Sequence, residues 1–231
     1  MSNGASAFPM LVIVPARCAH EAKPLFLEPL GAGAIIDGTL DAAERQRDRG
    51  AVTLLATTDD ARIIDHIGAR GGDWLTRLRE TDEEKAGYFS ALCAGRDHAT
   101  TESGEAFASV LVLEPSHPFR PEGLVANAIE ILERDPALDT VVPVVREYGN
   151  IWTRDGHGAL HRMRTPMGQE FYREIAGLSL LTRPHAMTRE TAMGKDVGFV
   201  VVEEQWALID IHGPDGVAFA QRYSGLLHPA G

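Results

Sequence analysis

A short run of aliphatic residues near the amino terminus constrains the fold of this chain most. Leu11-Val-Ile-Val14 is continuous and is followed at once by Pro15. Runs of this kind are typical of strands that are buried on both faces of a sheet. The run is too short to span a membrane, and no basic segment or cleavage pattern makes it a signal peptide. We therefore expect a cytoplasmic protein without a membrane partner.

Similar apolar runs recur along the chain and alternate with helical patterns. Further strands are expected at residues 52–56, 109–113, 140–145, 175–182, 197–202 and 207–211. Helices are expected at residues 34–49, 82–96 and 183–193, from Pro121, and after Pro214. Another helix carries Ile63, Ile64 and Ile67 on one side, and Thr58 or Asp59 is expected to cap it.

This alternation indicates the fold class. Strands that alternate with helices favour an α/β fold with a mainly parallel sheet that is covered on both faces. The length of 231 residues, with 44% hydrophobic and 24% charged residues, suits a single domain over 1–231. Residues 146–180 depart from the pattern, because the early part of this segment is rich in Gly, His and Arg without a sustained period. We expect an excursion from the sheet there, as a small hairpin that serves either as a dimerisation arm or as a lid.

The net charge and the small number of cysteines argue against two classes of protein, non-specific nucleic-acid binders and disulfide-rich scaffolds. The formal net charge is −11 at pH 7. Non-specific nucleic-acid binding depends on Lys and Arg contacts to phosphate, so no nucleic-acid partner is expected. Cys18 and Cys93 are too few for a disulfide framework.

The loop after the first strand is the first place to look for a ligand, because ligands of open α/β sheets gather at the carboxyl ends of strands. Residues 15–24 have neither the glycine spacing of a dinucleotide-binding turn nor that of a P-loop. Arg17 and Lys23 lie six residues apart in this loop. Both cations could face one polyphosphate.

Four segments carry a more specific signal: Leu11-Val-Ile-Val-Pro-Ala-Arg17, Thr57-Thr-Asp-Asp-Ala-Arg-Ile63, Leu113-Glu-Pro-Ser-His-Pro-Phe-Arg120 and Ile209-Asp-Ile-His-Gly-Pro-Asp215. In this order they resemble segments of the CMP-sugar-acid synthetases, which activate sialic acids and KDO with CTP. The resemblance implies a nucleotide-diphospho-sugar transferase fold and a homodimer built partly through residues 146–180. It also implies transfer of CMP from CTP to a sugar acid, with release of pyrophosphate and with Mg²⁺ or another divalent metal.

The same resemblance implies roles for the nucleotide site. Arg17, Lys23 and Asp210 would be catalytic. Ala16 would lie near the cytosine, and Arg17 and Lys23 near the phosphates. Arg77 and Arg79 fall where the family carries an arginine, so one of them is expected at the triphosphate.

Metal and acceptor roles follow in the same way. Asp210 would hold the metal, and His212 would either join it or drop out of the metal shell. For the acceptor, the resemblance implies contacts from Glu114, Ser116, Arg120, Gln169 and Tyr172. The sequence leaves a second role open for Arg120, which is to orient the turn before Pro121. Asp59 and Asp60 are interpreted as helix caps.

Departures from the family pattern keep other functions open. The sialic-acid enzymes carry Gly-Gly-Ser-Lys-Gly after the first motif, and this chain has Cys18-Ala-His-Glu-Ala22. Glu114 stands in place of a Gln, and His212 in place of an Asp. A non-catalytic binding or assembly protein is one alternative. A nucleotidyltransferase with a non-sugar hydroxy-acid or phosphonate acceptor is another.

Overall fold

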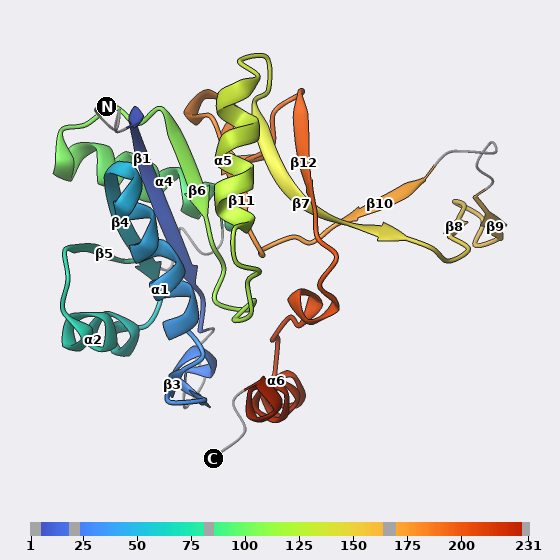
Figure 1. Cartoon of the computed structure of the whole chain (residues 1–231), viewed down its shortest axis with the longest axis horizontal. Helices are drawn as coiled ribbons and strands as arrows, with labels where there is room; N and C mark the ends of the chain where they lie inside the picture. Colours follow the sequence, from blue (N-terminus) through green and yellow to red (C-terminus); the bar gives the residue numbers. More distant parts are fainter. Residues whose placement is uncertain (1–5, 19–23, 81–85, 164–169, 228–231) are drawn as a thin grey trace, which may run out of the picture.

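In the computed structural model, which describes residues 6–18, 24–80, 86–163 and 170–227, an eight-stranded sheet is flanked by helices (Figure 1). Strands β1, β4, β5 and β6 are parallel to their neighbours in this group and form one half of the sheet. In the other half, β12 is parallel to β7, whereas β10 and β11 run antiparallel to it. The expected mainly parallel α/β sheet is confirmed.

The sheet order is β10-β7-β11-β6-β1-β4-β5, with β12 also paired to β7. The strands of this sheet are β1 (Ser6–Ala16), β4 (Gly50–Thr58), β5 (Trp74–Leu78), β6 (Ser109–Val112), β7 (Thr140–Glu147), β10 (Phe171–Glu174), β11 (Leu180–Thr182) and β12 (Val197–Val201). Two small hairpins pair β2 (Pro29–Leu30) with β3 (Gly33–Ala34), and β8 (Trp152–Arg154) with β9 (Leu160–Arg162). The α-helices are α1 (Asp37–Glu44), α2 (Ala61–Arg70), α4 (Tyr88–Ser103), α5 (Leu124–Arg134) and α6 (Pro214–Leu227). Single 3₁₀ turns are η1 (Leu25–Leu27), η2 (Arg45–Arg49), η3 (Pro184–Ala186) and η4 (Gln205–Leu208).

Strand β1 is the centre of the core, as its apolar run predicts. Val12 and Val14 pack into one hydrophobic cluster with residues of α1, α2 and α5. Leu11 and Ile13 belong to a second cluster, which includes residues of α4. All four side chains are fully buried. Successive side chains of a strand point to opposite faces, so β1 needs a hydrophobic layer on each side.

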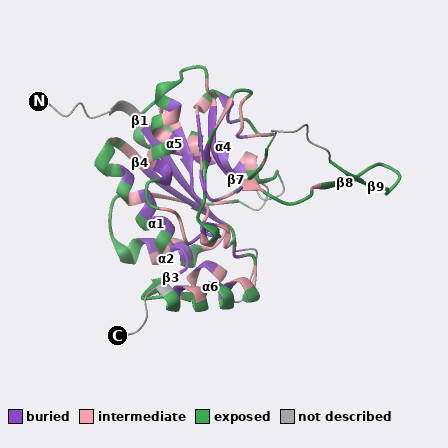
Figure 2. Cartoon of the chain, turned by 45° about the vertical axis from the view of Figure 1, so that its right-hand side comes forward, coloured by how far each residue is buried: buried purple, intermediate pink, exposed green. Residues whose placement is uncertain are grey.

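The expected excursion is present as a projecting arm that carries β8 and β9 (Figure 2). It leaves the sheet after β7 and returns through β10, where Phe171 pairs with Glu147. Trp152 and Leu160 are each 57% exposed on this arm. The arm therefore adds apolar surface that the sheet of its own chain does not cover.

Several expected elements are wrong, each for a local reason. Residues 183–193 form only η3, because the Thr188 and Thr191 backbones and hydroxyls bond to each other and so compete with a helix. Residues 207–211 form η4 and an extended stretch, whose Ile211 N–H donates to the Ser116 carbonyl (2.9 Å). Helix α5 begins at Leu124 instead of Pro121, after Gly123 in a left-handed conformation.

The cap of α2 also differs from the prediction. Asp60, and neither Thr58 nor Asp59, is the N-cap, and its carboxylate accepts the Arg62 N–H (2.9 Å). The cap interpretation is therefore right for Asp60 and wrong for Asp59. Strand β5 was not predicted, because it is a half-exposed edge strand without an apolar run.

Across the described parts of the chain, no helix combines the length and apolar character that a membrane crossing requires.

Candidate active site

A cavity of about 250 Å³ opens beside the carboxyl ends of β1 and β6. Its lining contains five residues that the sequence singles out, together with others that it does not: Arg17, Arg79, Glu114, Ser116 and His212, with Pro15, Phe26, Gly87, Tyr88, Ala91 and Pro115. Parallel strands end at one edge of a sheet, so loops that are distant in the sequence meet there. The structure thus brings the first, third and fourth sequence motifs to one cavity.

The segment after β1 is held in place by the second motif and by the residue after β5. The Cys18 N–H donates to the Asp59 carboxylate (2.7 Å), which explains why Asp59 is not free to cap α2. The Ala16 carbonyl accepts a hydrogen bond from the Arg79 guanidinium (2.6 Å). Ala16 is buried, but Arg17 is exposed and lines the cavity. The backbone is therefore fixed, while the Arg17 side chain is exposed at the cavity.

Glu114 and Tyr88 face each other across this cavity. The Tyr88 hydroxyl donates a 2.5 Å hydrogen bond to Glu114 Oε1. Burial of this hydroxyl and the neighbouring Glu114 carboxylate raise the pKa of Tyr88 well above its ordinary value, although the residue as a whole is 42% exposed. Gly177 lies so close that a Cβ there would come within 3.0 Å of Glu114 Cδ. Among the described residues, the hydrogen bond to the Glu114 carboxylate comes from this neutral hydroxyl.

Asp210 forms a second polar group at the edge of the cavity. Its Oδ2 lies 2.6 Å from His212 Nε2, and its Oδ1 lies 3.6 Å from His117 Nε2. His117 is 2% exposed and also bonds to the Ala176 carbonyl (2.9 Å). Burial lowers the pKa of His117, and the Asp210 carboxylate opposes that effect.

The fit of a divalent metal rests on this Asp210 carboxylate, whose side chain is 34% exposed. Within the described ranges, no three His, Cys, Asp or Glu side chains are grouped to hold a metal. Mg²⁺ is commonly held by one or two carboxylates with phosphate and water oxygens, so a single Asp suits it. His212 Nε2 is engaged with the Asp210 carboxylate, and a hard cation such as Mg²⁺ prefers oxygen ligands to imidazole nitrogen. The donor set therefore fits Asp210 as a ligand better than His212.

Arg120 takes the second role that the sequence left open. Its guanidinium donates to the Leu178 carbonyl (2.7 Å), to Thr39 Oγ1 (2.7 Å) and to the Glu114 carbonyl. These bonds orient the turn that carries Glu114 and Ser116, and Arg120 is not part of the cavity lining.

Other predicted site residues lie elsewhere. Arg77 is on β5, paired in register with Thr57, and does not line the cavity. Tyr172 is on β10 at the base of the arm, where its hydroxyl donates to Glu170 (2.6 Å). Lys23 and Gln169 fall outside the described residues. The sequence does not predict Tyr88, because it reaches Glu114 through the packing of α4 and not through a local motif.

No family model matches the sequence, and no curated protein sequence matches it. Among solved structures, a 4-diphosphocytidyl-2C-methyl-D-erythritol synthase from Anaerococcus prevotii is similar, with a TM-score of 0.67, 14% identity, and coverage of 94% of this chain and 96% of that one. A CMP:2-keto-3-deoxy-manno-octonic acid synthetase complexed with CTP has a TM-score of 0.62, 13% identity, and coverage of 95% and 98%. A 2-C-methyl-D-erythritol 4-phosphate cytidylyltransferase from Thermus thermophilus has a TM-score of 0.61, 16% identity, and coverage of 94% and 99%. The chain therefore has, over nearly its whole length, the nucleotide-diphospho-sugar transferase type of fold found in these cytidylyltransferases.

Proposed function

We propose that this protein is a homodimeric cytidylyltransferase that transfers CMP from CTP to a sialic-acid-like or KDO-like sugar acid. One observation carries the proposal: Arg17 and Arg79 line the same cavity as Glu114 and His212, at the strand ends of a fold that cytidylyltransferases share. To bind a triphosphate together with its metal ion, a site needs cationic side chains for the phosphates and carboxylates for the metal.

We assign the nucleotide-binding roles from the hydrogen bonds that these side chains already make within the chain. Arg79 holds the Ala16 carbonyl and so fixes the backbone that would lie beside the cytosine. Arg17 is exposed toward the cavity and would bind the phosphates, together with Lys23. A divalent metal held by Asp210 would offset the charge of the triphosphate. Most of the rate enhancement would then come from positioning and charge neutralisation.

In the reaction, an acceptor hydroxyl oxygen forms a bond to the α-phosphorus of CTP. The bond from that phosphorus to the bridging oxygen breaks, and pyrophosphate leaves with the bonding electrons. We assign the hydroxyl proton to Glu114, the carboxylate of the cavity lining. Ser116 would bind the acceptor beside it. Gln169 and Tyr172 would reach an acceptor only from the arm of a partner subunit.

Two other functions stay open. The first is a transferase with a remodelled acceptor site, because Glu114, held by Tyr88, stands where the resembled family carries a Gln. Such a site would take a non-sugar hydroxy acid or a phosphonate whose anionic group lies away from the Glu114 carboxylate. The second is a non-catalytic binding protein, for which the altered loop after Arg17 is the reason.

Thermal unfolding with CTP, UTP, ATP or GTP, with magnesium and then with chelator, tests the nucleotide. A ligand at about 100 times its Kd adds about 2.7 kcal/mol to the stability of the folded state. We expect a rise in Tm that is selective for CTP and is reduced in Arg17→Gln, with Arg222→Gln as the matched surface control. If no nucleotide raises the Tm, the binding of CTP is rejected and the non-catalytic function replaces it.

Pyrophosphate release with a panel of acceptors tests the reaction. The panel contains sialic acids, KDO, a polyol phosphate, small hydroxy acids and phosphonates. We expect turnover with a sugar acid, and we expect Asp210→Asn to nearly abolish it while the Tm without ligand stays within a few degrees. Normal turnover by Asp210→Asn in magnesium would show that the metal role is misassigned.

A further inference from the structure

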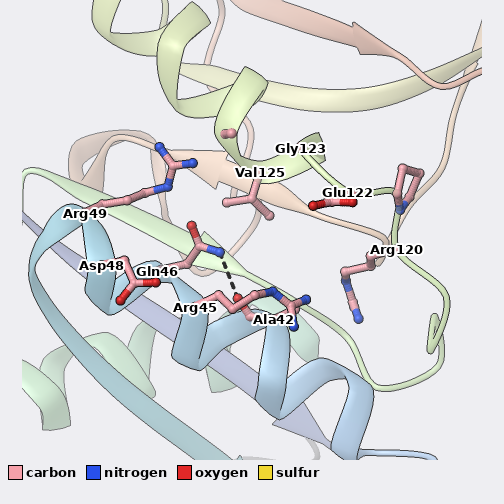
Figure 3. A pocket seen from close by; sticks show the side chains of 11 residues that line it. Ala42, Arg45, Gln46, Asp48, Arg49, Arg120, Glu122, Gly123 and Val125 are labelled. Atoms are coloured by element: carbon pink, nitrogen blue, oxygen red, sulfur yellow. Dashed lines mark hydrogen bonds between the residues drawn. The ribbon is translucent and has the colours of Figure 1, made fainter.

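A second and larger cavity lies between the end of α1 with η2 and the start of α5 (Figure 3). It is a groove of about 840 Å³, and no residue of its lining belongs to the lining of the strand-end cavity. Arg45, Gln46 and Arg49 come from η2, and Gly123 and Val125 come from the start of α5. The proposed cytidylyl transfer leaves this groove without a role.

The groove has more positive than negative charge. Arg45 and Arg49 are exposed, and neither guanidinium has an ion pair or hydrogen bond to another described residue. Arg120 lines the same groove; burial lowers its pKa to about 9, with the charge of Glu114 opposing this and that of Arg45 adding to it. Asp48 and Glu122 are the carboxylates of the lining, so arginines outnumber them.

The first turn of α5 adds main-chain donors to the same groove. This helix runs over Leu124–Arg134, and no side chain caps its N-terminus. Gly123 precedes it with a φ of 81°. The first N–H groups of a helix have no partner within the helix and favour an anion. In α5 the Leu124 N–H donates to the Pro121 carbonyl (3.2 Å), so the N–H groups of Val125 and Ala126, which line the groove, are the ones left for a ligand.

Gln46 supplies an observation that is independent of these charges. It is 6% exposed, and its Nε2 donates to the Ala42 carbonyl (2.8 Å), which fixes the orientation of the amide. Its Oε1 is enclosed and accepts no hydrogen bond from any described residue. Figure 3 shows this oxygen turned toward the space between Arg49 and Val125. An enclosed acceptor without a donor is unfavourable, so it calls for a ligand that brings an O–H or N–H group.

We propose that this groove is a binding site for a phosphate group, either of inorganic phosphate or of a small phosphate monoester. The phosphate oxygens would accept hydrogen bonds from Arg45, Arg49 and the first N–H groups of α5. The O–H of hydrogen phosphate, or an alcohol hydroxyl of a monoester, would donate to Gln46 Oε1. Sulfate has a similar size and charge but no proton to donate at neutral pH. The site should therefore prefer phosphate to sulfate.

Calorimetric titration of the full chain with inorganic phosphate, glycerol phosphate and sulfate tests the site. We expect saturable binding of phosphate and weaker binding of sulfate. Arg45→Gln/Arg49→Gln should weaken phosphate binding about tenfold, because two charge-assisted hydrogen bonds are lost. Arg134→Gln, an exposed arginine at the other end of α5, is the matched control and should bind as the wild type does. Tighter binding of glycerol phosphate than of phosphate would identify a monoester as the ligand, and the reverse would identify inorganic phosphate.

Gln46→Met tests the contribution of the Gln46 acceptor separately from that of the arginine charges. It should bring phosphate binding down to the level of sulfate, with sulfate binding unchanged. Equal affinities for phosphate and sulfate in the wild type would overturn the proposal, as would wild-type phosphate affinity in the double arginine variant.

Arg17→Gln distinguishes this groove from the strand-end cavity. We expect it to lose the CTP-dependent rise in Tm and to keep phosphate binding, and the double arginine variant to do the opposite. If Arg17→Gln alone abolished phosphate binding, the phosphate would lie in the strand-end cavity and the groove proposal would be wrong. The groove can thus fail while the cytidylyltransferase proposal stands, and the converse also holds.

Discussion

The Tyr88 hydroxyl donates a 2.5 Å hydrogen bond to Glu114 Oε1, so the start of α4 is joined to the loop after β6. Tyrosine ordinarily ionises near pH 10, and here enclosure of the hydroxyl and the Glu114 charge raise that pKa well above its ordinary value. The hydroxyl therefore remains a donor throughout the neutral range. It keeps the Glu114 carboxylate in one position while a ligand enters.

Tyr88→Phe should remove this restraint without disturbing the nucleotide contacts. We expect a loss of about 1 kcal/mol of stability, the typical worth of one hydrogen bond. The KM for the acceptor should rise, whereas the CTP-dependent rise in Tm should be unchanged. Steady-state kinetics with each substrate varied in turn measures this, and a change in the affinity for CTP alone would contradict it.

Absorbance titration of the tyrosinates gives a second measurement on the same residue. The chain has four tyrosines, and Tyr88 should ionise later than the others. Because the folded pKa is raised, the stability that this group contributes is present below about pH 10 and is lost as the pH rises through the folded pKa. Tyr88→Phe should remove the late part of the titration. An unchanged late phase in this variant would mean that another tyrosine is responsible.

Arg120 should be important for stability because its bonds join three distant parts of the chain. Arg120→Met should cost several kcal/mol, since the Leu178 and Glu114 carbonyls and Thr39 Oγ1 each lose a donor. Arg120→Lys should restore little, because an ammonium lacks the planar fork that reaches three acceptors. Chemical denaturation measures both variants. Full rescue by Lys would indicate that charge alone matters.

Asp37 should make the protein sensitive to acid. Burial by itself raises the pKa of Asp37, but hydrogen bonds from the Ala34 N–H (2.6 Å) and His66 (2.8 Å), and the charges of His66 and Arg70, lower it overall. A carboxyl with a lowered folded pKa contributes stability above the unfolded value of about 3.9 and loses it as the pH falls through the folded pKa. Asp37→Asn should therefore lose stability at pH 7 and show a flatter decline below about pH 4. If the stability of the variant fell as steeply with pH as that of the wild type below about pH 4, this prediction would be refuted.

The arm should control assembly if the proposed homodimer uses it. Trp152 and Leu160 are exposed on β8 and β9, and interfaces are enriched in such aromatic anchors. Trp152→Ser/Leu160→Ser should shift the protein toward monomer in sedimentation velocity, with an unchanged Tm for the monomer. Phe219→Ser, which removes an exposed apolar side chain of α6, is the control. A dimer that is unaffected by the double variant would place the interface elsewhere.

The sequence predicts a strand of this fold where both of its faces are buried, and it fails where burial is weak or where buried residues do not pair in a sheet. The apolar run at Leu11–Val14 identifies β1 because a strand between two helical layers has no polar face. Strand β5 escapes prediction because it is an edge strand whose residues are all partly exposed and form no apolar run. The 207–211 stretch is apolar because Ala207 and Ile211 pack in the core, and packing alone does not require a ladder of hydrogen bonds.

In the candidate site, too, the sequence predicts some residues and does not predict others. Arg17, Glu114, Ser116 and His212 meet in one cavity because they follow strands or precede a helix at one edge of the sheet. Tyr88 reaches Glu114 through the packing of α4, which no local pattern reveals. The sequence also could not decide the role of Arg120, because its acceptors are two main-chain carbonyls and a threonine hydroxyl from other parts of the chain.

The pairing of Glu147 with Phe171 closes the base of the arm, so the chain leaves the sheet and returns to it at adjacent positions. The free energy of closing such a loop changes only slowly with its length. The arm can therefore be lengthened, shortened or exchanged during evolution while the strand-end cavity keeps its shape. If, as proposed, the arm selects the partner and the cavity the nucleotide, a graft of a foreign arm between these two residues would change the partner and leave the nucleotide unchanged.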